Sequence, residues 1–100
     1  MLLQESILGL ADEDKIFEKA AKMYIAYSHG KNFCEVRPQQ KELLILLDIN
    51  PSELFDPYKL ARNVSNIGHY GTGDVEVRLS ELSDVDKVMD LIKQSYLLTV

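Results

Sequence analysis

Apolar residues recur at helical spacing near both ends of the chain. Leu3, Ile7 and Leu10 are three or four residues apart, which predicts a short amphipathic helix over residues 2–10. A longer repeat of the same kind predicts a helix from about Asp84 to Leu97, preceded by a capping box over residues 83–86. The expected buried stripe of this last helix is Val85, Val88, Met89, Ile92 and Tyr96.

Between these helices the apolar positions follow strand patterns. Residues 23–27 are rich in β-forming side chains, and residues 33–37 alternate, with Cys34 and Val36 on one face. Residues 43–47 are all apolar, which indicates a strand that is buried on both faces. Because only short turns separate the three segments, the pattern predicts an antiparallel meander.

Two segments are less regular. Residues 15–21 have helix-forming side chains, but they are equally compatible with an extended approach to the next strand. Asp56, followed by a proline, is a typical helix start, and it predicts a helix over residues 57–64 with Leu60 and Val64 facing inward.

Residues 74–79 alternate again and predict a later strand. The order is then helix, three strands, helix, strand, helix. This order predicts an α+β, two-layer sandwich, in which helices pack on one face of a mainly antiparallel sheet made of a three-strand meander plus one later strand. We expect residues 1–100 to form a single domain, and the abrupt, uncapped first helix suggests the C-terminal part of a longer protein.

Composition places the chain among ordinary globular domains, with 46% hydrophobic and 27% charged residues. The formal net charge is −5, which argues against a protein that holds nucleic acid by bulk attraction, although a local basic patch remains compatible with it. Cys34 is the single cysteine, so an intrachain disulfide is excluded and a reducing, cytoplasmic location is expected. The N-terminal stretch lacks the basic residues and the continuous apolar segment of a signal peptide, so we do not expect it to be one, and no apolar run is long enough to span a membrane.

The stretch NVSNIGHYGTGD, residues 63–74, is the strongest candidate for a site. Its glycines favour a tight reversal between two elements, and the same backbone could form a nest of N–H groups for an anion. It is neither a Walker loop nor a Rossmann fingerprint, so we expect no cofactor. We give the structural interpretation the greater weight. If the surface does bind a ligand, the expected residues are Lys59, Arg62, Asn66, Gly68, His69, Tyr70, Gly71, Gly73 and Asp74.

Other groups of residues are weaker candidates for a functional site. His29 and His69 lack the spacing of a helical metal pair, so no metal site is expected, and the face that Cys34 shares with Val36 indicates a buried thiol rather than a nucleophile. His69 with Asp74 would make a base and its orienting carboxylate if they met in a cleft.

Aromatic side chains with basic neighbours suggest a further surface. They could form a base-stacking platform on the sheet, and the platform would consist of Tyr24, Tyr27, Phe33, Lys31 and Arg37. The apolar run 43–47 would also serve assembly with another copy if it lay at a sheet edge.

Three stretches of the sequence resemble those of an uncharacterised bacterial domain family: YIAYSHGKNFCEVRPQQKELLILL, DPYKLARNVSNIGHYGTGDVEVRL and LSDVDKVMDLIKQSY. The family is marked by a NIGHWGNGD-type motif and carries the loose label "predicted transport protein". This chain has Asn63, Tyr70 and Thr72 where Asp, Trp and Asn are usual. There is a weaker similarity to YjbR-like double-wing domains, some of which are suspected of binding DNA.

The family often stands behind nuclease-like or restriction-type domains. The resemblance therefore implies a non-catalytic accessory domain of a DNA-processing or defence-type protein, which contacts nucleic acid or a partner protein. A small enzyme that uses His69 as its base, and a pure assembly module, are the alternatives.

Overall fold

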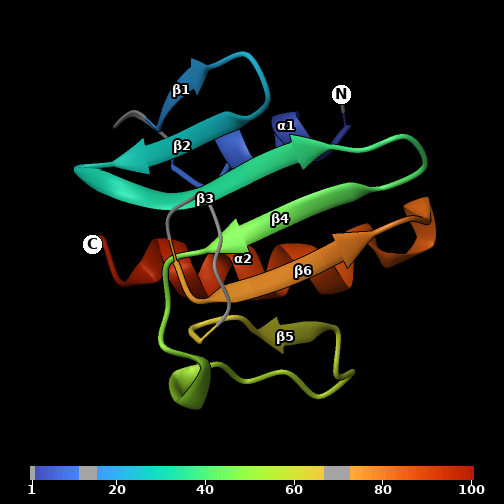
Figure 1. Ribbon diagram of the computed structural model, residues 1–100. Coiled ribbons are helices and arrows are strands. Elements are labelled where there is room, and N and C mark those ends of the chain that lie inside the picture. Colours follow the sequence, from blue (N-terminus) through green and yellow to red (C-terminus); the bar gives the residue numbers. More distant parts are fainter. Residues whose placement is uncertain (1, 12–15, 67–72) are drawn as a thin grey trace.

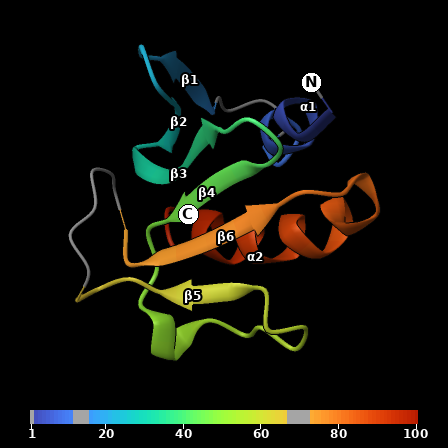
Figure 2. The same cartoon turned by 45° about the vertical axis from the view of Figure 1, so that its right-hand side comes forward.

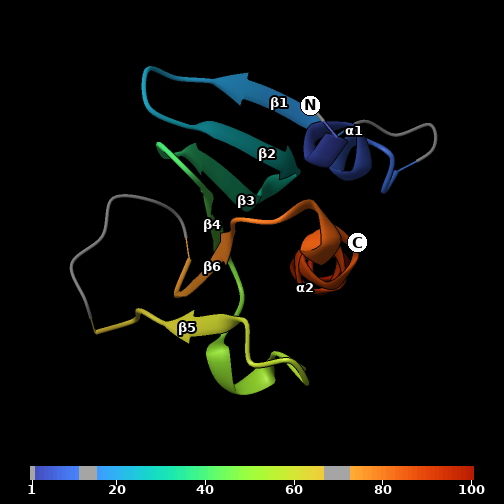
Figure 3. The ribbon, with the colours of Figure 1, turned by 90° about the vertical axis from the view of Figure 1, so that its right-hand side faces the viewer.

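The computed structural model describes residues 2–11, 16–66 and 73–100. Six strands form one antiparallel sheet in the order β1-β2-β3-β4-β6-β5. Both α-helices lie on the same side of this sheet (Figure 3), which confirms the two-layer α+β sandwich. The elements shown in Figure 1 are α1 (Leu2–Leu8), β1 (Phe17–Ala20), β2 (Ile25–His29), β3 (Lys31–Pro38), β4 (Leu43–Leu47), η1 (Pro51–Glu53), β5 (Ala61–Asn63), β6 (Val75–Leu79), η2 (Leu82–Asp84) and α2 (Val85–Leu97).

The expected meander is present as β2, β3 and β4, and β6 extends it on the far side of β4. Strand β4 is therefore internal, which explains why its whole sequence is apolar. The idea that residues 43–47 lie at a sheet edge is wrong, since they are hydrogen-bonded to β3 on one side and to β6 on the other.

Two strands lie where the sequence is ambiguous or misleading, and they are the two edges of the sheet (Figure 2). Residues 17–20 form β1, so the extended alternative for this segment is the one that the chain adopts. The helix predicted over residues 57–64 is wrong: the chain makes one turn, and residues 61–63 then pair with β6 as strand β5. Leu60 and Val64 nevertheless face inward as expected, Leu60 against the core and Val64 only 2% exposed.

The core lies between the sheet and the helices. Ile45 of β4 pairs with Val36 of β3 and with Val77 of β6, and all three side chains are fully buried. We call this side of the sheet, which faces the helices, the inner face. Helix α2 contributes the predicted Val85, Val88 and Ile92, and it also buries Leu91 and Ser95.

A bulge brings one more aromatic ring into this core. The register between β2 and β3 shifts between Tyr27 and Ser28, and Phe33 is skipped in the pairing. Its ring is fully buried and packs edge-on against Tyr96 of α2, with ring centroids 5.5 Å apart. Phe33 therefore belongs to the core and not to the polar face of β3, because the bulge breaks the simple alternation there.

The hydroxyl group of Ser95 fastens α2 to the sheet at the same place. It is fully buried and donates to the carbonyl oxygen of Phe33 at 2.6 Å. The predicted capping box at the other end of α2 is not formed, since Ser83 and Asp86 make no hydrogen bond to each other. Asp84, which stands at the N-cap position, makes no side-chain capping bond and pairs with Lys87 at 3.6 Å. The first turn of α2 is preceded by η2, which orders the approach without a side-chain cap.

Glycine is required at position 73 for two independent reasons. Gly73 has φ +97, which other residues rarely adopt, and a Cβ atom there would lie 2.0 Å from the carbonyl oxygen of Leu47. Gly30 has φ +81 in the β2–β3 turn, but a Cβ atom there would have no other atom within 4 Å. Both positions require a positive φ angle, but only position 73 lacks room for a Cβ atom.

We therefore expect Gly73→Ala to destabilise the fold more than Gly30→Ala. Backbone strain costs about 1–2 kcal/mol at either site, and a steric clash adds about 1–3 kcal/mol at position 73 alone. Urea unfolding of the two variants followed by circular dichroism measures the difference. Equal losses of unfolding free energy would mean that the close approach to Leu47 does not exist in solution.

Candidate functional site

The residues predicted as a ligand surface fall into two groups. Lys59, Arg62 and Asn66 are exposed on or beside β5, and Asp74 is exposed at the start of β6. The amide of Val64 donates to the carbonyl oxygen of Asp74 at 2.8 Å, so the two ends of the glycine corner are held together. Gly73, which is described, lies next to Asp74 against the Leu47 backbone. The other four predicted residues lie outside the described residues, and with them the proposed His69 base: Gly68, His69, Tyr70 and Gly71.

Asp56 fixes the backbone that leads into β5. Its two carboxylate oxygens accept hydrogen bonds from the amides of Leu60, at 3.0 Å, and Ala61, at 2.8 Å. Lys59 has φ +54, and this left-handed residue follows the turn at residues 57–58 and directs the chain into the sheet. The aspartate that resembles a helix start thus closes a tight loop, and Arg62 follows on the edge strand.

The face of the sheet away from the helices carries charged side chains in two neighbouring rows. We call this the outer face, and its described members on β3, β4, β5 and β6 are Glu35, Arg37, Leu44, Leu46, Arg62, Glu76 and Arg78. Along one row Glu35, Leu46, Glu76 and Arg62 stand side by side, and the next row holds Arg37, Leu44 and Arg78. Acidic and basic groups therefore meet both along and between strands.

Ion pairs link these rows. Arg37 lies 3.4 Å from Glu35, and its guanidinium group also stacks over the Tyr24 ring, 4.9 Å from the ring centroid. Glu76 is shared between Arg78, at 3.3 Å, and Arg62, at 3.9 Å. Arg78 in addition pairs closely with Glu42, and this hydrogen bond is the main reason that the pKa of the Arg78 guanidinium is raised.

The base-stacking platform expected on the sheet is not assembled as predicted. Tyr27 and Phe33 are fully buried, so neither ring is available to a base. Tyr24 is partly exposed, but the guanidinium group of Arg37 covers its ring.

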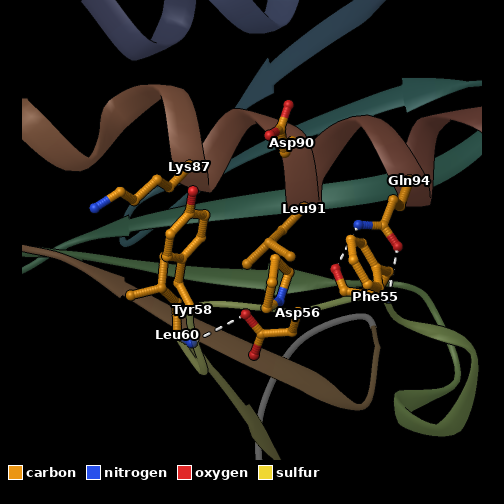
Figure 4. A pocket seen from close by; sticks show the side chains of 9 residues that line it. Phe55, Asp56, Tyr58, Leu60, Lys87, Asp90, Leu91 and Gln94 are labelled. Atoms are coloured by element: carbon orange, nitrogen blue, oxygen red, sulfur yellow. Dashed lines mark hydrogen bonds between the residues drawn. The ribbon is translucent and has the colours of Figure 1, made fainter.

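A pocket of about 290 Å³ lies between α2 and the segment before β5 (Figure 4). Leu60 and Leu91 contribute its apolar lining, and the rings of Phe55 and Tyr58 stand on either side of Leu91. The side chain of Gln94 holds this wall in place, since it accepts from the Phe55 amide and donates to the Phe55 carbonyl oxygen, both at 2.8 Å.

Two charged side chains of α2, Lys87 and Asp90, lie at the edge of this pocket, and in Figure 4 their charged ends point away from Leu91. The ammonium group of Lys87 lies 4.7 Å from the centroid of the Tyr58 ring and pairs with Asp84. Asp90 also lines the pocket, and within the described part of the chain its carboxylate has no ion pair or hydrogen bond.

His29 is hydrogen-bonded to the C-terminal segment, unlike a turn residue that only solvent surrounds. Its Nδ1 atom lies 3.0 Å from the hydroxyl oxygen of Thr99, and that hydroxyl group donates to the Tyr96 carbonyl oxygen at 2.6 Å. Because a hydroxyl group has one hydrogen, Nδ1 of His29 must be the donor in the first bond. Among residues 2–11, 16–66 and 73–100, no three His, Cys, Asp or Glu side chains are arranged to hold a metal ion.

Cys34 is buried, as its position on the strand predicted. Burial raises the pKa of the Cys34 thiol well above its ordinary value, and the negative charge of Glu35 raises it further. A thiol in this state is a poor nucleophile at neutral pH. Burial also raises the pKa of Tyr27, whose hydroxyl group donates to Glu18 at 2.8 Å.

These two groups predict a loss of stability in alkali. Because the folded pKa values lie above the unfolded ones, the stabilisation is complete below about pH 8.5 and decreases once the unfolded chain ionises. Each retained proton contributes a slope of about 1.4 kcal/mol per pH unit. Urea titrations at several pH values between about 8 and 11 measure this slope.

The variant Cys34→Ala supplies the control for this prediction. It should be less stable at neutral pH because it leaves a cavity, but its unfolding free energy should fall less steeply from about pH 9 upward. Tyr27→Phe should change the slope only above about pH 10. A Cys34→Ala slope identical to that of the wild type would contradict the assignment.

Comparison with known sequences gives the chain a family. The family described as "Domain of unknown function (DUF5655)" matches residues 1–99. The chain belongs to this family. An uncharacterized protein of Haemophilus influenzae is 39% identical over 92 residues, which are 92% of this chain and 30% of that protein.

The resemblance to an uncharacterised bacterial domain family is confirmed at that level by DUF5655 and the bacterial relative. The chain spans less than a third of the relative's length. No solved structure is significantly similar to the chain. In the described part of the chain, no helix has the length and apolar character that a membrane crossing requires.

The pocket beside α2 has almost no signature in the sequence. Phe55 and Tyr58 are exposed aromatic residues in the segment predicted as a helix start, and Asp90 and Gln94 fall outside the predicted buried stripe of α2. Phe55 and Gln94 are 39 residues apart, so no local pattern connects the two walls. The aromatic pair beside a predicted helix start is the one signal that could have indicated the pocket.

Proposed function

We propose that the chain is a non-catalytic accessory domain of a longer, DNA-processing or defence-type protein, and that its β5 edge contacts the backbone of a nucleic acid. The length of the Haemophilus influenzae relative supports the accessory role, because the matched region is 30% of that protein. The resemblance to domains that follow nuclease-like partners supports the choice of ligand.

The arrangement of Arg62 carries the proposal. Its side chain is 60% exposed on an edge strand, and its carboxylate partner, Glu76, is 3.9 Å away. Glu76 keeps a closer partner in Arg78. Arg62 can therefore exchange Glu76 for a phosphate group without leaving Glu76 unpaired, so that the exchange avoids the cost of a stranded charge.

Neighbouring groups extend this surface. Lys59 is exposed three residues earlier, on the turn that Asp56 closes, and Asn66 is exposed beyond the end of the strand. Lysine supplies a second phosphate contact and the asparagine amide supplies both a donor and an acceptor. A net charge of −5 opposes the approach of a polyanion, so binding is expected to be weak and strongly dependent on salt.

Fluorescence anisotropy with single- and double-stranded oligonucleotides tests this surface. The wild type should bind at about 20 mM salt and lose most of its affinity by about 150 mM, with a logarithmic salt slope of about −2 for two phosphate contacts. The double variant Lys59→Glu, Arg62→Glu should bind at least about tenfold more weakly, because both contacts become repulsive.

A matched variant separates this site from a general charge effect. Lys22→Glu, Lys93→Glu changes the net charge by the same amount, but Lys22 lies on the β1–β2 connection and Lys93 lies on α2, away from β5. It should weaken binding much less than the double variant at β5. Equal weakening, or no wild-type binding at about 20 mM salt, removes the nucleic-acid ligand from the proposal.

A further inference from the structure

Two polar side chains that line the pocket beside α2, those of Asp56 and Gln94, already hold backbone groups of the neighbouring segment. Both carboxylate oxygens of Asp56 accept backbone amides, and both ends of the Gln94 amide are bonded to the Phe55 backbone. A polar ligand group that entered would have to share the atoms of these two side chains with the backbone groups that they already bind. Buried polar groups require partners, so the group that fits this interior is apolar.

The shape and lining of the pocket agree with this conclusion. Leu91 points between the two aromatic rings, and Leu60 and Pro57 complete an apolar lining. The volume of about 290 Å³ is at the lower end for ligand pockets, and it suits a single side chain better than a larger molecule. Phe55 is 73% exposed and Tyr58 is 60% exposed, so both rings also offer apolar surface outside the pocket.

The rim of the pocket, in contrast to its apolar interior, carries charged side chains. Asp90 is exposed, lines the pocket and has no ion pair among the described residues. Lys87 does not neutralise it, because its ammonium group pairs with Asp84 and lies over Tyr58. The chain as a whole is acidic, with a net charge of −5. Charge complementarity at the rim therefore selects a cation.

We propose that this pocket docks a segment of a protein partner in which an apolar side chain is flanked by lysine or arginine. The apolar side chain inserts between Phe55 and Tyr58 onto Leu91, and the flanking cation pairs with Asp90. This site lies against α2, on elements other than the outer-face row that holds Arg62, and it does not require the nucleic-acid contact.

Short blocked peptides test the proposal directly. The probe is Arg-Gly-Leu-Gly-Arg, and the two comparison peptides are Arg-Gly-Ser-Gly-Arg, without the apolar anchor, and Glu-Gly-Leu-Gly-Glu, with reversed charge. Each is titrated into the isotope-labelled chain, while the amide resonances of Phe55, Leu60 and Ala61 and the side-chain amide of Gln94 are followed by NMR. Saturable shifts are expected with the probe, and at least about tenfold weaker binding with either comparison peptide.

Two pairs of variants locate the site. Phe55→Ser removes one wall and should weaken the probe about tenfold, whereas Phe17→Ser, which replaces a similarly exposed ring on β1, should leave its affinity unchanged. Asp90→Asn should weaken the probe about two- to fivefold, whereas Asp86→Asn, an exposed carboxylate on the same helix that does not line the pocket, should not. These surface changes leave the core contacts in place, and an unchanged NMR spectrum elsewhere checks the fold.

Several results would overturn the proposal. One is the absence of a saturable shift at these resonances up to about 10 mM probe. The dissociation constant would then exceed about 10 mM, and a single well-placed side chain should bind more tightly than that. Another is a glutamate-flanked peptide that binds as tightly as the probe, and a third is an equal effect of the two members of either variant pair. Oligonucleotide binding measured on Asp90→Asn should match the wild type, so failure of one proposed site is distinguishable from failure of the other.

Discussion

The packing of helix α2 on the inner face of the sheet determines where the other parts of this fold lie. Val88 and Ile92 are fully buried in the core, and Ser95 ties the helix to the carbonyl oxygen of Phe33. A buried hydroxyl group without a hydrogen-bond partner would cost free energy. This bond therefore fixes both the rotation of the helix about its axis and its position along the sheet. Helix α1 packs against α2 and completes the apolar layer.

The same helix organises the segment that lies outside the sheet. Gln94 lies between the buried residues Ile92 and Ser95, but it faces the flank of α2, where it binds both polar groups of the Phe55 backbone. This pair replaces the regular secondary structure that residues 54–60 lack. One face of α2 thus builds the core while the adjacent flank builds the pocket, and the position of the pocket follows from the packing of the core.

The strongly periodic parts of the sequence predicted their structure correctly. Both terminal helices, β3 and β6 are present where apolar residues recur at a fixed period, and β2 and β4 are present where the chain is rich in β-forming or apolar residues. Strand β5 escaped prediction because Asp56 and the following proline are typical of a helix start, whereas the structure uses that carboxylate to close a single turn. Pairing with β6 then decides the conformation of residues 61–63, and a three-residue segment carries no periodic signal of its own.

The candidate surfaces were predictable only in part, for the same reason. Lys59 and Arg62 are close in sequence to Asn66, and such neighbours remain neighbours in space. The ion pair of Arg62 with Glu76 and the pocket between Phe55 and Gln94 join distant segments, and their existence depends on strand register and helix rotation. A single sequence gives the period of an element but not the register in which it meets another.

Asp56 connects the two surfaces physically. One of its oxygens holds the amide of Leu60, whose side chain lines the pocket, and the other holds the amide of Ala61, which begins the strand that carries Arg62. The pocket lining and the basic edge are therefore positioned by one carboxylate. Because Gln94 holds the start of the same segment at Phe55, the connection between η1 and β5 is fixed at both ends although it has no regular secondary structure. A short irregular segment held in this way can present two different surfaces with the rigidity of the sheet and helix that support it.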